Sequence, residues 1–210
     1  MIDPQEEAKE VYRRYAAMAG NLDSEHGLGG QLLYADLLSH ASIQLVRAAN
    51  IAGAASFTIS AESAALRQAM REGIVDFVVT TLDEALRILK NEVRKRQPVS
   101  VAIHCADVSA FMLEMRERGV RPDLQNVAPE PLDGTREWLA LSLPAGDALF
   151  AAELDAVVMD ALPESDLSTR RWYRLAPRYL PRQMRSLRTV ACGREAAQRI
   201  QTWYEQAKQV

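Results

Sequence analysis

The sequence predicts a three-layer α/β domain with a mainly parallel sheet and helices on both of its faces. From residue 30 to residue 119, short apolar runs alternate with amphipathic segments that carry an apolar residue every three or four positions. Strands separated by such helices form βαβ units, in which the strands are parallel. In addition, 48% of the 210 residues are hydrophobic, which is sufficient for a buried core without disulfides or a structural metal.

The first half of the chain is expected to supply the sheet. An amphipathic helix is predicted over residues 4–19, and a polar, glycine-rich turn over 23–29 leads into the first strand. Thr81 and Glu84 form a capping-box pattern, which marks the start of a later helix. The strands are expected at 30–35, 54–59, 74–79 and 99–103, and the helices that follow them at 42–51, 62–72, 82–96 and 108–118.

The second half of the chain has a less regular pattern. Strands are predicted over 123–127, 138–142 and 187–191, and helices over 147–162 and 195–209. Pro177 and Pro181 exclude one continuous helix over 168–188. We expect a single domain, in which residues 1–29 form an N-terminal helix and turn and residues 135–210 form a C-terminal extension.

Charge and cysteine content exclude several classes of protein. Lys and Arg number 25 and Asp and Glu 28, giving a net charge of -3, so no overall field attracts nucleic acid or a membrane surface. The acidic N-terminus is unlike a leader peptide, and no apolar run is long enough to cross a bilayer. We therefore expect a cytoplasmic protein that does not contact a membrane. Cys105 and Cys192 lie far apart, with no further cysteine or histidine at ligand spacing, so we expect no metal site.

Five segments carry a more specific pattern. They read G-Q-L-L-Y at 30–34, A-A-N-I-A-G-A at 48–54, V-D and then L-D-E-A-L-R within 75–87, V-S-V-A-I-H at 99–104, and E-R-G-V-R-P-D-L at 117–124. Through these segments the chain resembles, from Val11 to Asp133, the central NAD-binding domain of the urocanase (urocanate hydratase) family. The resemblance implies a Rossmann-like fold with its nucleotide site after the first strand.

The chain departs from this family at the nucleotide site. In the family, a glycine-rich loop ending in Ala-Gln follows the first strand and holds the NAD pyrophosphate, but residues 36–44 contain no glycine here. Ser60 stands where the family has an acidic residue for the ribose, and residues 126–130 replace a Thr-Asp-Gln-Thr-Ser run. The family's catalytic region, with its reactive cysteine, has no counterpart. We therefore expect no cofactor, with NAD as the alternative.

Polar side chains follow several of the predicted strands. Because the carboxyl ends of parallel strands meet at one edge of a sheet, a ligand-binding cleft is expected to be lined by Ser39, His40, Ser60, His104 and Asn126. His40 and Cys105 are the candidate catalytic residues, since a cysteine paired with a histidine becomes a nucleophile. His104 is less suited as the partner of Cys105, because adjacent residues of a strand point in opposite directions. The alternative is that Cys105 is a small buried hydrophobic residue and His40 a surface or capping residue.

The altered loop also leads to a prediction about packing. If residues 36–44 have replaced a phosphate-binding loop, Leu37 or Leu38 is expected to turn inward and fill the space of the pyrophosphate. Ser39 or Ser42 is expected to cap the following helix through its hydroxyl group.

Arginines dominate the segment between Asp166 and Glu195, which contains no acidic residue. Aromatic residues interleaved with them would suit contacts with phosphates and bases, whereas their spacing of three and four residues suits the solvated or dimer-facing side of a helix. We favour the second interpretation over nucleic-acid binding. The candidate partner-binding residues are Arg171, Arg174, Arg178 and Arg182.

Three hypotheses about function follow from these observations. The first is a urocanase-like Rossmann-fold protein that lacks hydratase activity and acts as a small-ligand-binding or protein-interaction module, as a homodimer formed through its C-terminal extension. The second is an enzyme, of the lyase/hydratase kind or another, that uses a nucleotide or small-acid substrate in the cleft. The third is binding of nucleic acid or an acidic partner by the arginine-rich segment.

Overall fold

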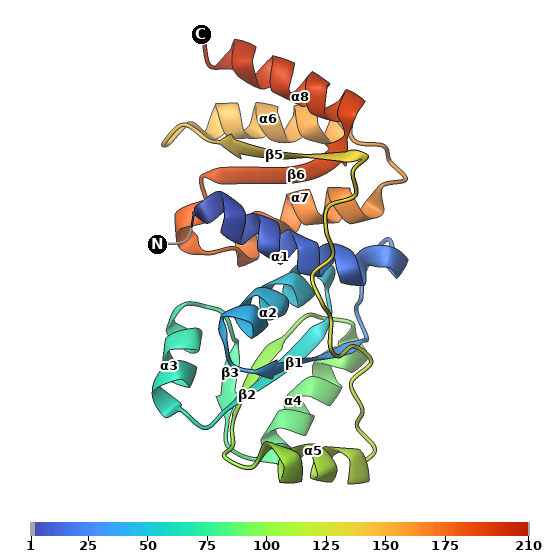
Figure 1. Ribbon diagram of the computed structural model, residues 1–210, viewed down its shortest axis with the longest axis vertical. Helices are drawn as coiled ribbons and strands as arrows, with labels where there is room; N and C mark the ends of the chain where they lie inside the picture. Colours follow the sequence, from blue (N-terminus) through green and yellow to red (C-terminus); the bar gives the residue numbers. More distant parts are fainter. Residues whose placement is uncertain (1–2, 210) are drawn as a thin grey trace. The chain divides into compact units, whose positions relative to one another are not determined.

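The computed structural model describes residues 3–209 and divides the chain into two compact units, which are drawn in Figure 1. Residues 10–129 form the parallel-sheet unit, and residues 3–9 and 130–209 belong to the antiparallel-sheet unit. The sequence analysis expected one domain with an extension. The difference arises because the C-terminal strands pair with each other and bury a core of their own, and do not join the parallel sheet.

The parallel-sheet unit is built on four strands. They are β1 (Leu32–Leu37), β2 (Ala55–Ser60), β3 (Phe77–Val79) and β4 (Ser100–His104). All are parallel, in the order β1-β2-β4-β3. The central strand β2 is buried from Ala55 to Ile59, as expected for a strand covered on both faces.

Helices cover both faces of this sheet, which confirms the predicted α/β, Rossmann-like fold. In Figure 1, α2 lies over one face, and α4 and α5 lie over the other. On the side of α4, the core contains Phe57, Ile59, Val101, Leu89 and Met115. The helices are α1 (Pro4–Met18), which runs from one unit into the other, α2 (His40–Ala52), α3 (Ser63–Arg71), α4 (Leu82–Lys95) and α5 (Val108–Glu117), with a short 3-10 turn η1 (Ala19–Asn21) after α1.

The strand predicted over 123–127 is reduced to a single bridge. Leu124 pairs with Leu33 beside β1, but the chain leaves the sheet directly afterwards. Asn126 adopts a positive φ of 55°, which ends the extended conformation that a strand requires. This prediction was therefore wrong in length, although its position next to β1 places residues 125–127 near the carboxyl end of the sheet.

The antiparallel-sheet unit contains a two-stranded sheet between helices. The strands β5 (Arg136–Ser142) and β6 (Leu187–Gly193) pair in the register Leu139 to Val190. Two helices, α6 (Ala148–Ala161) and α8 (Arg194–Ala207), cover one face of the sheet, and α7 (Leu167–Tyr179) covers the other (Figure 1). The predicted interruption within 168–188 is confirmed: α7 ends at Tyr179, two residues after Pro177, and a short 3-10 turn η2 (Arg182–Met184) follows it. Within residues 3–209, no helix has the length and apolar content that a membrane span requires.

Candidate ligand-binding site

The end of β1, where the segment without glycine begins, contains a left-handed residue. Asp36 has a φ of 66°, in the region that glycine adopts without strain and most other residues avoid. The Asp36 carboxylate stabilises this conformation, because its Oδ1 accepts a hydrogen bond from the Leu37 N–H at 2.8 Å. Thr58 Oγ1 donates to the Asp36 carbonyl oxygen at 2.7 Å. The loop is thereby tied to β2.

Leu38 is half-buried, but the prediction that Leu37 turns inward after β1 is wrong, because Leu37 is 50% exposed. The cause is a bulge in β1: Tyr34 is paired with Phe57 and Leu37 with Ile59, so β1 uses one residue more than β2 over this interval. One extra residue turns the side chains that follow it to the opposite face of the sheet.

The prediction of a serine cap on α2 is confirmed in both of its forms. Ser39 Oγ accepts a hydrogen bond from the Ser42 N–H at 3.2 Å, and Ser42 Oγ accepts one from the Ser39 N–H at 2.7 Å. This reciprocal pair is a capping box. The two N–H groups point at serine hydroxyls and are not available to a ligand at the start of the helix.

A cavity of about 250 Å³ lies where this loop meets β1 and α2. Two of the three non-glycine residues with positive φ among residues 3–209, Asp36 and Asn126, line it. Backbone positions of this kind concentrate at binding sites, so we take the cavity as the candidate site. Its polar lining residues are Arg14 of α1, Tyr34 and Asp36 of β1, Ser39 and Ser42 at the start of α2, and Gln125 and Asn126.

The cavity carries two opposite charges. Arg14 Nε donates to Gln44 Oε1 at 3.3 Å, and no carboxylate within residues 3–209 forms an ion pair with Arg14. Asp36 likewise has no cationic partner in the described part of the chain. The Tyr34 ring stacks on Phe57, and both burial and the nearby Asp36 carboxylate raise the pKa of the Tyr34 hydroxyl. The Tyr34 hydroxyl therefore stays protonated and able to donate at neutral pH.

A comparison with protein families identifies the scaffold of this site. The family described as the urocanase Rossmann-like domain matches residues 17–133, which is more than half of the chain. The chain belongs to the urocanase family. The matched range contains all four parallel strands and, apart from Arg14, every residue that lines the cavity. The resemblance inferred from the sequence motifs is confirmed.

Two of the predicted ligand-binding residues of this urocanase-family chain, Ser60 and His104, lie next to each other outside the cavity. They are register partners at the ends of β2 and β4. In the order β1-β2-β4-β3, the connection that leaves β2 runs toward β3, whereas the connection that leaves β4 runs back toward β1. The neighbouring ends of β2 and β4 therefore form a topological switch point. Their polar atoms, however, bond locally: His104 Nε2 lies 3.0 Å from the Ala61 carbonyl oxygen, and Ser60 Oγ accepts from the Glu62 N–H.

The two candidate catalytic residues are not brought together. Cys105 Sγ donates to the Asp107 carbonyl oxygen at 3.2 Å, and within residues 3–209 no hydrogen bond joins it to a histidine. His40 is exposed and lies beside Gln44, one turn along the same helix, at 3.0 Å between the two Nε2 atoms. His40 thus lies at the surface, at the start of α2. Cys105 is half-buried, which makes it more accessible than a core residue.

Ser39 and Asn126 were expected in the site from the sequence, whereas Arg14, Tyr34 and Asp36 were not. Asp36 had a usable signal, since it begins the segment that replaces the glycine-rich loop of the urocanase family. Tyr34 had none, because it falls within a predicted strand. Arg14 lies on a helix that precedes the sheet, and only tertiary packing brings it to the end of β1.

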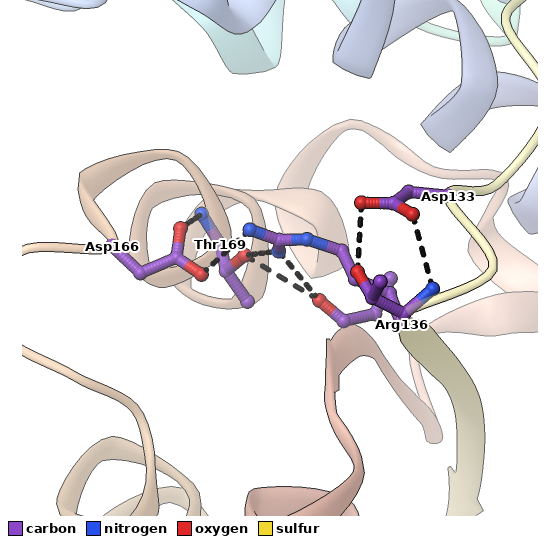
Figure 2. A network of polar contacts seen from close by, with 6 residues as sticks. Asp133, Arg136, Asp166 and Thr169 are labelled. Carbon is purple, nitrogen blue, oxygen red and sulfur yellow. Dashed lines mark hydrogen bonds and ion pairs between the residues drawn. The ribbon is translucent and has the colours of Figure 1, made fainter.

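A separate polar network organises the antiparallel-sheet unit (Figure 2). Arg136 Nη1 donates to Thr169 Oγ1 at 2.6 Å and to the Ala191 carbonyl oxygen at 3.1 Å, and Arg136 Nη2 pairs with Asp166 Oδ2 at 3.0 Å. Asp166 Oδ1 also accepts from the Thr169 N–H and so caps α7. The network links β5, β6 and α7. It pairs the polar groups of this urocanase-family chain with one another at a partly buried position.

The arginine-rich segment divides into structural and exposed residues. Arg170 Nη1 donates to the Met159 and Leu162 carbonyl oxygens at the end of α6, both at 2.8 Å, and Arg188 pairs with Asp155. The interleaved aromatics Trp172 and Tyr173 are buried, so they are not available to stack on bases. Of the predicted partner-binding arginines, Arg171 is half-buried and the exposed ones are Arg174, Arg178 and Arg182.

Proposed function

We propose that this chain is a small-ligand-binding member of the urocanase family that does not catalyse the hydratase reaction. The observation that carries the proposal is the polar cavity at the carboxyl end of β1, with Asp36 and Asn126 held in left-handed conformations at its wall. Open α/β sheets bind ligands at this edge. A binding site explains why the chain keeps two strained positions there, Asp36 in the segment that has lost its glycines and Asn126 just after the Leu124 bridge.

The same loop is poorly suited to hold NAD. A pyrophosphate at the start of α2 would lie beside the Asp36 carboxylate, and the like charges would repel each other. The N–H groups of Ser39 and Ser42, which would hold phosphate oxygens at a helix N-terminus, already donate to serine hydroxyls. Ser60 offers no carboxylate to a ribose. These features favour a smaller, less anionic ligand.

The cysteines give no support to hydratase chemistry. Cys192 is buried, and burial raises the pKa of its thiol to about 11, which keeps it protonated at neutral pH. Cys105 donates to a backbone carbonyl and has no imidazole partner in the described part of the chain. Neither thiol is placed as an activated nucleophile.

The absence of NAD binding and hydratase activity can be tested directly. We expect that about 1 mM NAD leaves the melting temperature of the purified chain unchanged, and that the absorbance of urocanate stays constant when chain and NAD are added. A urocanase with known activity serves as the positive control. A rise in melting temperature with NAD, or urocanate consumption above that of the buffer, would contradict this part of the proposal.

The ligand itself is sought by native mass spectrometry of the chain purified without denaturation. We expect an added small mass that disappears in Ala41→Phe, because Ala41 lines the cavity and the larger ring fills it. Ala64→Phe is the matched control, since Ala64 has the same exposed second position in α3 that Ala41 has in α2. An added mass that survives Ala41→Phe would place the ligand elsewhere.

A second candidate function rests on the exposed arginines of the antiparallel-sheet unit. Arg174, Arg178 and Arg182 lie at intervals of four residues and have no carboxylate partner within residues 3–209, which suits an acidic protein partner. We expect the chain to bind a heparin column, used as a polyanion probe, and to elute at lower salt when all three residues are changed to Gln. Equal elution of the two proteins would remove this candidate.

A further inference from the structure

The charges in the cavity indicate the chemistry of its ligand. Arg14 and Asp36 line the same cavity, yet each lacks an ion-pair partner among residues 3–209. A charge that loses part of its hydration in a cavity is stabilised by an opposite charge. Two unpaired charges of opposite sign are therefore best matched by a ligand that carries both signs itself.

The donor geometry of Arg14 suits a carboxylate. Its Nε is engaged by Gln44 Oε1 at 3.3 Å, which holds the guanidinium group in place from the side of α2. The two terminal nitrogens, Nη1 and Nη2, donate to no residue within 3–209. A planar pair of N–H donors is the group that binds carboxylates in a bidentate manner.

The acceptor geometry of Asp36 suits a cationic group. Asp36 Oδ1 accepts from the Leu37 N–H and lies 3.5 Å from the Tyr34 hydroxyl, whereas Asp36 Oδ2 accepts no hydrogen bond from the described residues. The left-handed backbone at Asp36 and its hydrogen bond to the Leu37 N–H fix where this carboxylate stands. An ammonium group would complete the pairing of Asp36.

The size of the cavity limits the ligand. A volume of about 250 Å³ corresponds to roughly eight water molecules at ~30 Å³ each, which admits a molecule of amino-acid size and excludes a dinucleotide. Phosphate would meet the Asp36 carboxylate, and a simple amine would meet Arg14. We propose that the cavity binds a small zwitterion of the amino-acid class, with its carboxylate on Arg14 and its cationic group on Asp36. This inference rests on the proposed function, because it names the ligand class of the same cavity.

The test is a calorimetric titration of the full chain with the free α-amino acids. We expect at least one to bind, and we expect its N-acetyl derivative and its carboxamide each to bind at least about tenfold more weakly, since each derivative removes one charge. Inorganic phosphate is titrated as the purely anionic probe. These measurements use the unaltered chain and do not depend on the folding of a variant.

Two variants connect the effect to the cavity. Arg14→Gln and Asp36→Asn are each expected to weaken amino-acid binding at least about tenfold; asparagine is chosen because it tolerates a positive φ. Arg67→Gln and Glu117→Gln, which change exposed residues that do not line the cavity, are the matched controls and should bind as the unaltered chain does. Melting temperatures verify that all four variants are folded.

The outcomes separate this inference from the proposed function. Equal binding of the free amino acid and its two derivatives, equal or tighter binding of phosphate, or no binding of any amino acid up to about 10 mM overturns the zwitterion inference. If phosphate or a copurified molecule binds and Ala41→Phe abolishes that binding, the cavity remains a ligand site of another chemistry. If no ligand depends on Ala41, the proposed function fails as well.

Discussion

Ser39 and Ser42 bond to each other's backbone at the start of α2, with Ser42 Oγ accepting from the Ser39 N–H at 2.7 Å and Ser39 Oγ accepting from the Ser42 N–H at 3.2 Å. The helix N-terminus of an α/β sheet is normally available to an anionic ligand. Here the Ser39 and Ser42 N–H groups donate to the chain's own hydroxyl groups, and the proposed ligand site is the neighbouring cavity lined by Asp36 and Arg14.

The capping box makes a measurable contribution to stability. Ser39→Ala removes the acceptor of the Ser42 N–H and is expected to lower the free energy of unfolding by about 1 kcal/mol. Ser109→Ala, at an exposed position in α5, is the control and should have little effect. Equal urea midpoints for Ser39→Ala and the unaltered chain would show that the cap is dispensable.

The left-handed conformation of Asp36 predicts an order of stability among its variants. Neither alanine nor glycine has a carboxylate to accept from the Leu37 N–H, so the two variants differ in backbone strain alone. Alanine at a φ of 66° is strained, whereas glycine adopts this conformation freely. We therefore expect Asp36→Ala to unfold with a free energy about 1 kcal/mol lower than that of Asp36→Gly. Chemical denaturation of the two variants measures this difference. If the alanine variant is the more stable one, Asp36 does not hold a positive φ in solution.

Much of the parallel-sheet unit was predictable because it follows local rules. Alternating apolar runs and amphipathic segments gave β1, β2, β4 and the helices between them to within a few residues. Thr81 accepts from the Glu84 N–H at the start of α4, and Gly53 ends α2 with a φ of 97°, as their positions in the sequence indicate.

The candidate site was less predictable because it depends on one inserted residue. A strict period of two assigns each strand residue to a face, but the bulge between Tyr34 and Leu37 reverses that assignment. Leu37 is consequently exposed, and a cavity lies at this end of β1. Arg14 reaches the cavity through packing between elements, which no local pattern describes. The separate antiparallel-sheet unit was missed for a similar reason, since pairing partners of strands are set by tertiary structure.

The Arg136 network predicts a site of high sensitivity in the antiparallel-sheet unit. Arg136→Met would remove the donors to Asp166 Oδ2, buried Thr169 Oγ1 and the Ala191 carbonyl oxygen, so we expect a loss of about 2 kcal/mol in the free energy of unfolding. All three tryptophans, Trp138, Trp172 and Trp203, belong to this unit, so their fluorescence follows its unfolding in urea.

Arg194 provides the matched control for Arg136. Its side chain is 77% exposed and pairs with Glu137 at 3.2 Å, and exposed pairs of this kind contribute less than about 1 kcal/mol. We expect Arg194→Met to change the unfolding midpoint much less than Arg136→Met. Similar losses in both variants would mean that the network is no more important than an ordinary surface ion pair.

Cys192 is expected to make the antiparallel-sheet unit less stable in alkaline solution. The residue is 1% exposed, and burial raises the pKa of its thiol from 9.0 to about 11, although Arg136 opposes the shift. The folded state therefore holds a proton that the unfolded chain releases. The resulting stabilisation of about 3 kcal/mol is fully present below the unfolded pKa of 9.0 and is lost as the pH rises through the folded pKa of about 11. Urea unfolding of the unaltered chain and of Cys192→Ala, followed by tryptophan fluorescence from about pH 8 to about pH 11, isolates this effect from the titration of other groups. The stability advantage of the unaltered chain over Cys192→Ala should shrink across this range, and an advantage that stays constant would show that the thiol titrates alike in both states.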